Sequence, residues 1–196
     1  GRWEEAIAPL EKATALEPEA PRWAELLAEI QLRRRRPDLA AAALGRTPSA
    51  GASSRGQGLL GQALLAQGHH EEATAALKEA LSPAGRLSTE ERVAFLQALG
   101  DAQEALQHPE AAWASYEAAL SLAQTAEEKI DLRRRRAGHL LQAGQPQVAI
   151  AELEAALPGG SQWSEIHLLL AQACRQAGEL EAAQAHARRA AQSQAV

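Results

Sequence analysis

The sequence predicts an all-α protein built from repeated helix pairs, and three observations support this. Alanine and leucine dominate the 196 residues while aromatic side chains make up only 3%, a composition that favours helices over sheets. A small alanine recurs every 33 to 39 residues, and in most copies a large apolar residue follows it four places later. In four copies a glycine stands five places before that alanine. A recurrence of this length is typical of stacked-repeat proteins. The pairs are Ala6/Leu10, Ala40/Leu44, Ala73/Leu77, Ala112/Tyr116, Ala149/Leu153 and Ala183/Ala187.

Each repeat is predicted to consist of a helix, a turn and a second helix. Ahead of the turn, apolar residues such as Leu60 and Leu64 are spaced so that they share one side of a helix. After the turn, Ala73 and Leu77 begin a second apolar stripe. Glycine suits the turn because a helix often ends in a left-handed residue. In chain order we expect an orphan second helix over 1–18, a degenerate repeat over 21–47, and repeats over 54–83, 88–123, 127–158 and 163–192.

Four places depart from this regular pattern. Gly45 to Gly58 resembles a linker, yet the spacing of the alanines shows no insertion, so we expect the preceding helix to end early and leave a weak, mobile seam. The extra residues of the longer steps fall near 82–90 and 121–127, where they lengthen helices or loops. Pro9 lies inside a predicted helix, where it should cost about 3 kcal/mol.

These residues resemble the tetratricopeptide repeat family, whose signature is Trp-x-x-Leu-Gly-x-x-Tyr, then Ala-x-x-x-Phe, then Pro. Residues 1–18 match the second helix of that signature, from Gly1 to Pro18. The first helix is degenerate. Its tryptophan position holds Gln57, Leu96, Arg133 and His167, and its tyrosine position holds Leu64, Gln103, Leu140 and Cys174.

The resemblance implies an α-solenoid, a right-handed superhelix of antiparallel helix pairs, with about five repeats plus a leading half-repeat. Residue 1 stands at the turn glycine and no capping helix follows the last repeat, so we expect a segment of a longer array. The resemblance also implies a non-catalytic scaffold that binds a partner protein or peptide in the concave groove. The first helix of each pair would line that groove. The candidate groove residues are Arg55, Gln62, Leu65, Gln97, Asp101, Glu104, Asp131, Arg134, Gln142, Leu168, Gln172 and Arg175.

The composition of the chain limits which classes of partner are expected. The net charge of −5 gives no reason to expect nucleic acid, and no apolar run approaches the roughly 20 residues that cross a bilayer. The family's chaperone-binding members clamp a terminal carboxylate with lysine and asparagine, and this chain has no asparagine. An alternative is a bacterial envelope scaffold that contacts an anionic or polysaccharide ligand during polymer export. Self-association through exposed solenoid ends is a further expectation. The sequence does not indicate whether the protein is located in the cytoplasm or in the periplasm.

Candidates for chemistry have simpler structural explanations. His69, His70 and His108 lie in predicted turns, too far apart for the three or four converging ligands of a metal site. Cys174 occupies a core position, where a small buried side chain is expected. We see no catalytic partner near His139, His167 or His186 in the repeat register. The sequence therefore predicts no enzyme, no metal and no cofactor.

Two arginine runs, 33–36 and 133–136, are the most unusual feature. Four consecutive residues point in every direction around a helix, so their stems should cover apolar surface while their guanidinium groups pair with glutamates of adjacent helices. The alternative is that Arg134 and Arg135 face the groove and bind an anionic partner. Trp23, Phe95 and Trp163 start first helices, where inter-repeat packing is the preferred reading over partner binding.

Overall fold

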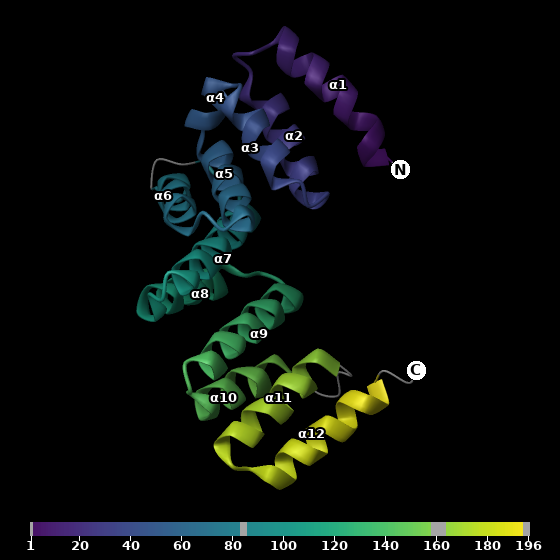
Figure 1. Ribbon diagram of the computed structural model, residues 1–196, viewed down its shortest axis with the longest axis vertical. Helices are drawn as coiled ribbons and strands as arrows, with labels where there is room; N and C mark the ends of the chain where they lie inside the picture. The colour runs from purple at the N-terminus through teal and green to yellow at the C-terminus, as the bar shows by residue number, and fades with distance from the viewer. Residues whose placement is uncertain (1, 83–85, 158–163, 194–196) are drawn as a thin grey trace. The chain divides into compact units, whose positions relative to one another are not determined.

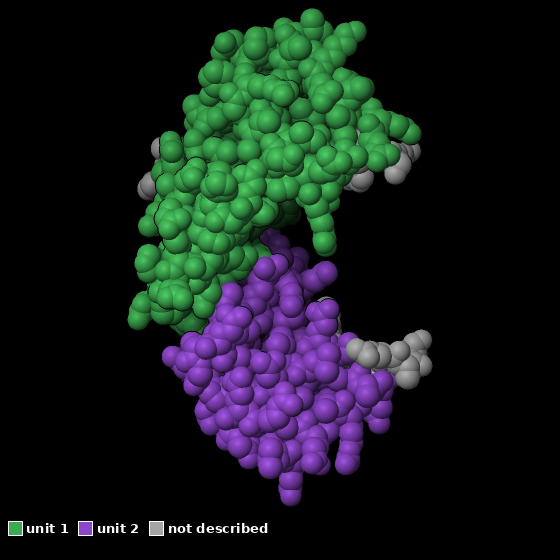
Figure 2. Space-filling model, viewed as in Figure 1, with its two compact units in different colours: residues 1–122 green, residues 123–196 purple. Residues whose placement is uncertain are grey.

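The computed structural model of this chain describes residues 2–82, 86–157 and 164–193, and all regular secondary structure in those ranges is helical (Figure 1). The all-α prediction is therefore confirmed. The chain divides into two compact units, residues 1–122 and 123–196, which Figure 2 distinguishes by colour. Each unit is described by itself.

The described residues of unit 1 form a leading helix, three helix pairs and one short helix. The first helices of the pairs are α2, α5 and α7, and the second helices are α3, α6 and α8. Successive first helices contact one another, α2 with α5 and α5 with α7. The bounds are α1 (Arg2–Leu16), α2 (Pro21–Arg33), α3 (Pro37–Gly45), α4 (Pro48–Ala52), α5 (Ser54–Gln67), α6 (His70–Ala80), α7 (Thr89–Ala105) and α8 (Pro109–Leu122).

In the part of unit 2 that the structure describes there are two helix pairs: α9 (Ala126–Gln142) with α10 (Pro146–Ala156), and α11 (Ser164–Ala177) with α12 (Leu180–Ser193). One apolar cluster joins α9, α10 and α11 through Leu141, Leu153, Ile166 and Leu170. Helices α7 and α9 each have 17 residues, against 14 for α5 and α11. The longer repeats therefore extend their first helices. Each of the two long helices begins with a capping box, at Ser88 and Thr125.

The turn glycines have the left-handed conformation that the sequence predicts. Gly68, Gly144 and Gly178 have φ of 84°, 71° and 84°. The turns between α2 and α3 and between α7 and α8 have no glycine, and there Arg35 and Gln107 take φ of 57° and 60°. The left-handed turn is thus kept where its usual residue is missing. Gly1 lies outside the described residues.

The helix before the stretch from Gly45 to Gly58 ends early, as the sequence predicts, because α3 ends at Gly45. Residues 48–52 form the short helix α4, and both Thr47 and Ala50 are fully buried. A Cβ atom on Gly56 would overlap the Ala50 carbonyl, so α4 packs closely on the start of α5. Small residues here allow a tight fit between helices rather than a loose connection. Pro9, in contrast, lies inside α1 as expected.

Side-chain size governs the packing of unit 1. The ring of Phe95 in α7 lies on Gly58 in α5, where a Cβ atom would overlap it. A Cβ atom on Gly100 would lie 2.6 Å from Cε1 of Tyr116, a side chain that is only 1% exposed. Glycine therefore permits these helices to approach around large side chains.

Candidate functional site

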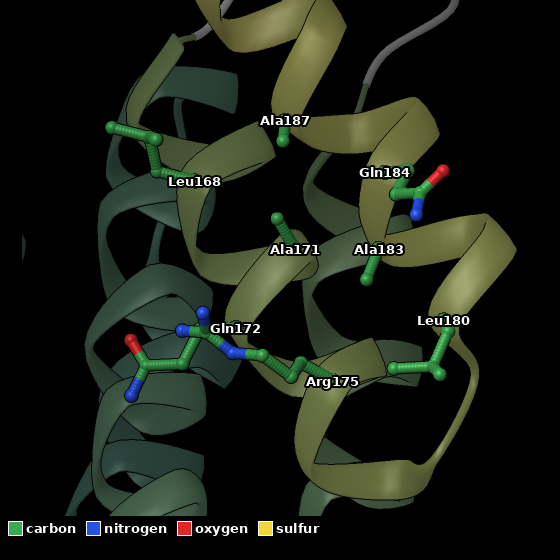
Figure 3. Close-up of a pocket in the computed structure, with 8 residues that line it drawn as sticks. All are labelled: Leu168, Ala171, Gln172, Arg175, Leu180, Ala183, Gln184 and Ala187. Carbon is green, nitrogen blue, oxygen red and sulfur yellow. The ribbon is translucent and has the colours of Figure 1, made fainter.

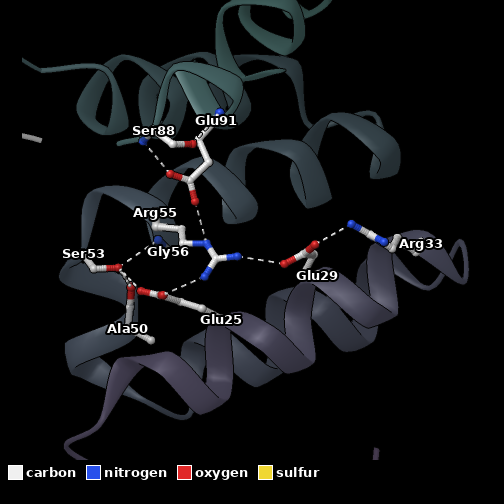
Figure 4. Close-up of polar contacts among 9 residues, drawn as sticks. All are labelled: Glu25, Glu29, Arg33, Ala50, Ser53, Arg55, Gly56, Ser88 and Glu91. Carbon is white, nitrogen blue, oxygen red and sulfur yellow. Dashed lines mark hydrogen bonds and ion pairs between the residues drawn. The ribbon is translucent and has the colours of Figure 1, made fainter. Parts of the chain in front are cut away.

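Arg55 links three successive first helices in unit 1. Its Nη2 atom lies 2.8 Å from a carboxylate oxygen of Glu29 in α2, and its Nε atom lies 2.9 Å from Glu91 in α7. A third, longer pair joins Nη1 to Glu25 in α2 at 3.8 Å. Figure 4 shows the guanidinium between the three carboxylates. The side chain remains one-third exposed, so this network lies on an accessible face of the first helices.

Hydrogen bonds fix two of these carboxylates further. Ser53 Oγ donates to Glu25 at 2.6 Å, and the backbone N–H of Ser88 donates to Glu91 at 2.8 Å. Arg33 pairs with Glu29 at 2.7 Å. The network thus contains three carboxylates and two guanidinium groups, and its formal charge is −1. It is a preorganised surface of mixed charge (Figure 4).

The other unit 1 candidates have different environments. Gln62 and Gln97 are partly exposed on α5 and α7. Asp101 accepts a hydrogen bond from the hydroxyl of Tyr116 at 2.7 Å, which ties it to the packing of α7 on α8. Leu65 packs against the apolar cluster that contains Leu77, so it contributes to packing.

Helix α9 in unit 2 contains the run 133–136, and all four arginines pair with carboxylates. Arg133 and Arg136 both pair with Glu152 of α10, each at 3.3 Å, and Arg136 is only 3% exposed. Arg134 pairs with Asp131 at 2.7 Å and with Glu165 of α11 at 3.8 Å. These contacts agree with the ion-pair reading of the run.

Asp131 also accepts a hydrogen bond from Arg135 at 3.0 Å. Burial works to raise the pKa of this carboxyl, but the hydrogen bonds and charges of Arg134 and Arg135 outweigh burial and lower its pKa. The two guanidinium groups are thereby partly neutralised by their own helix.

The run 33–36 does not lie within one helix, so the expectation that its side chains radiate around a helix is wrong. Helix α2 ends at Arg33, and Arg34 to Arg36 form the turn into α3. Arg34 pairs with Glu4 of α1 at 3.2 Å. The difference arises because the next helix begins at Pro37, which has no N–H to continue the preceding one.

The remaining unit 2 candidates lie at the ends of first helices or beside a surface hollow. Gln142 is exposed at the end of α9. Gln172 and Arg175 lie beside a hollow of about 430 Å³ between α11 and α12, called here the α11/α12 hollow (Figure 3). Its lining is mostly apolar and comprises Leu168, Ala171, Gln172, Arg175, Leu180, Ala183, Gln184 and Ala187.

A histidine pair that the sequence analysis missed joins α11 to α12. The Nδ1 atoms of His167 and His186 are 3.1 Å apart, and the ring centroids are 5.3 Å apart. Burial, together with the nearby charge of Arg189, lowers the pKa of His167. The pKa of His186 is also lowered, first by burial and then by the charges of His167 and Arg189. Their places in the register, four residues before Ala171 and three after Ala183, do not by themselves predict this contact.

The side chains considered for other chemistry are placed as follows. Cys174 is a buried free thiol, and burial raises its pKa, which disfavours the reactive thiolate. Within the described ranges, no cluster of three or more His, Cys, Asp or Glu side chains could bind a metal ion. Phe95 is buried between repeats. The indole of Trp23 donates to Glu17 at 3.0 Å, and Trp163 lies outside the described residues. None of the helices that the structure describes is both long and apolar enough to span a membrane.

Comparison with solved structures shows the same fold in several proteins. A protein studied as PilF of Pseudomonas aeruginosa is 22% identical, with a TM-score of 0.72, over 95% of this chain and 82% of that one. BtubC from P. vanneervenii is 19% identical, with a TM-score of 0.74, over 100% and 92% of the two chains. YrrB, described as a TPR protein with an unusual peptide-binding site, is 16% identical, with a TM-score of 0.69, over 94% and 92%.

Among curated proteins, no match was found. Family models for the tetratricopeptide repeat match residues 1–63, 54–82, 93–125 and 134–195. Together with the helix pairs, the left-handed turns and the packing of small residues against large ones, these matches show that the chain belongs to the tetratricopeptide repeat family.

Proposed function

We propose that this chain is a non-catalytic scaffold that binds a peptide segment of a partner protein on the polar face of its first helices. Proteins of this family act in general as interaction scaffolds, which supports the broad role. YrrB, with the same fold, is described by its peptide-binding site. The proposed binding residues are Arg55, Gln62, Gln97 and Asp101 in unit 1, and Asp131, Arg134, Gln142, Gln172 and Arg175 in unit 2.

The Arg55 network is the observation that carries this proposal. It fixes side chains of α2, α5 and α7 in one arrangement before any partner arrives. A surface that is already ordered loses less conformational entropy on binding. Partly exposed Gln62 and Gln97 lie on the same first helices and offer amide donors and acceptors to an extended or helical peptide.

The charge of the network indicates what kind of peptide fits unit 1. Arg55 already pairs with Glu25, Glu29 and Glu91, so the cluster is not an anion clamp. Its charge of −1 favours a segment that presents lysine, arginine or neutral donors. The alternative from the sequence, an anionic or polysaccharide ligand, would have to compete with these carboxylates for the guanidinium groups.

Selection from a phage-displayed random peptide library on the purified chain tests the proposal. Peptides that bind should lose about tenfold in affinity when Gln62→Arg or Gln97→Arg adds bulk and charge to the face. Gln147→Arg is the matched control, since Gln147 is exposed on the second helix α10. Failure to enrich any peptide, or equal loss in the control, would overturn the proposal.

A titration with an anionic oligosaccharide provides the second arm. Saturable binding that is lost on Arg134→Glu, without any selected peptide, would favour the alternative. Circular dichroism of each variant should be unchanged, because the substituted side chains are partly or fully exposed.

A further inference from the structure

The α11/α12 hollow corresponds, in the repeat register, to a surface that is covered elsewhere in unit 2. Subtracting the 34 residues between Ala149 and Ala183 maps its lining onto the α9/α10 pair. Ala171, Arg175, Ala183 and Ala187 become Ala137, Leu141, Ala149 and Leu153. All four of these equivalents belong to the apolar cluster in which α11 packs through Ile166, Leu170 and Ala173.

Unit 1 provides a second example of the same arrangement. There the α5/α6 pair is covered by α7, whose Phe95 lies on Gly58 and packs with Leu77 and Ala98. In both units, therefore, the natural occupant of this surface is a helix that brings a row of apolar side chains.

The hollow keeps the features that accept such a helix. Leu168 and Leu180 are 49% and 62% exposed at its edges. Its floor includes Ala171 and Ala187, and Ala187 stands where the α9/α10 pair has the larger Leu153. The smaller side chain leaves room for a larger incoming residue, as Gly58 does for Phe95. Figure 3 shows these side chains around the hollow.

Arg175 makes the hollow differ from its covered counterpart in charge. It is exposed at the rim, whereas the equivalent Leu141 is buried beneath α11. A carboxylate on the incoming helix would complement this guanidinium.

We propose that the α11/α12 hollow binds an acidic amphipathic helix of a partner protein, with a large apolar or aromatic side chain seated over Ala171 and Ala187 and a carboxylate at Arg175. This inference rests on the proposed scaffold function and names the kind of ligand for the part of the proposed surface where Gln172 and Arg175 lie. The partner helix would take the place that α11 takes on the α9/α10 pair.

A peptide with the sequence of α7, residues 89–105, is the probe. It contains Phe95 in an apolar row that covers the α5/α6 pair, and its net charge is −3, from four carboxylates and one arginine. Labelled, capped and titrated with the full chain, it should show saturable fluorescence anisotropy. Leu168→Glu and Leu180→Glu should each weaken binding about tenfold, and Arg175→Glu about threefold.

Val148→Glu is the matched control, because Val148 is a 44% exposed apolar residue of α10 outside the hollow. This variant should bind the probe as well as the wild-type chain does. A probe that carries Phe95→Glu should not bind the wild-type chain. Absence of binding by the wild-type chain, or equal binding by Leu168→Glu, would overturn the inference.

Sedimentation of the wild-type chain and Leu168→Glu tests the other occupant. If the wild type self-associates and the variant is a monomer, a second copy occupies the hollow and the inference is wrong. The proposed function is tested independently of this inference, because its variants Gln62→Arg and Gln97→Arg lie in unit 1. Library peptides that depend on those residues, without binding of the probe, would leave that function intact.

Discussion

In two helix pairs of unit 1, α5/α6 and α7/α8, a glycine lies beneath a large side chain, whereas the equivalent positions of unit 2 carry alanine. Gly61 and Gly100 lie beneath Leu77 and Tyr116, with no space for a Cβ atom. Their counterparts in the register are Ala137 and Ala171.

Polar contacts join helices in both units, through Arg55 in unit 1 and through nearly buried groups in unit 2. The nearly buried Arg136 pairs with Glu152 across α9 and α10, and a histidine pair joins α11 to α12. Helix pairs of one repeat family can thus pack with either a glycine or an alanine beneath the large side chain. The glycine positions of unit 1 should therefore respond to added side-chain volume, and the Arg136 and histidine contacts of unit 2 to loss of charge and to pH.

The largest expected effect is the loss of the buried ion pair in unit 2. Arg136→Ala should lower the free energy of unfolding by about 3 kcal/mol, because Glu152, only 14% exposed, would lose one of its two guanidinium partners. Arg134→Ala, at a one-third exposed position, should cost less than about 1 kcal/mol. Urea denaturation, with hydrogen exchange to locate the change in α9 and α10, measures both. Equal losses would show that burial of the pair does not matter.

Side-chain volume is tested by adding one methyl group to each unit. In unit 1, Gly100→Ala should destabilise by about 1–2 kcal/mol, since crowding of the buried Tyr116 ring outweighs the better helix propensity of alanine. In unit 2, Gly138→Ala should stabilise by up to about 1 kcal/mol, because a Cβ atom there meets nothing within 4 Å. Urea denaturation measures whether each variant has a lower or a higher free energy of unfolding than the wild-type chain. If both variants were stabilised, steric fit would not distinguish unit 1.

The capping boxes provide a feature that the two units share. Ser88→Ala and Thr125→Ala should each destabilise by about 1 kcal/mol, because each hydroxyl accepts a hydrogen bond at 3.1 Å from an N–H of the first turn. Hydrogen exchange should become faster in the first turn of α7 for Ser88→Ala and in the first turn of α9 for Thr125→Ala. A much larger effect of Ser88→Ala would indicate that Glu91 transmits the loss to Arg55.

Much of the fold could be predicted because its signals repeat. The alanines, the larger residues after them and the turn glycines recur in register, and each copy supports the others. Short α4 could not be predicted from the same pattern. Its residues, Pro48 to Ala52, are typical of a loop, and the contacts of α4 with α2, α3 and the start of α5 come from outside this segment.

The candidate site was predictable as a set of helix faces, but its pairings were not. The register places Arg55 on a first helix, yet its three partners come from α2 and α7, which are distant in sequence. Likewise His167 and His186 lie 19 residues apart, and only the pairing of α11 with α12 brings their rings together. Contacts between helices depend on rotamers and crossing geometry that no single-helix pattern contains.

The smallest expected effect is a pH dependence confined to α11 and α12. Both histidines have a pKa below the ordinary value of 6.5, chiefly because of burial, with Arg189 adding to the shift and Glu154 opposing it at His186. As the pH falls, these histidines are therefore protonated in the unfolded chain before they are protonated in the folded chain. The stability from this pair is complete above pH 6.5 and should be lost as the pH falls from 6.5 towards the lower folded pKa values.

The hydrogen bond gives a structural reason for the same direction. At a separation of 3.1 Å, one Nδ1 atom donates and the other accepts, and protonation of both rings would leave two donors facing each other. Hydrogen exchange of α11 and α12, corrected for intrinsic rates, should show weaker protection at pH 5 than at pH 7. His186→Gln should reduce that difference, while His139→Gln in α9 serves as the matched substitution and should not. A pH response of equal size in His186→Gln would place its origin outside the histidine pair.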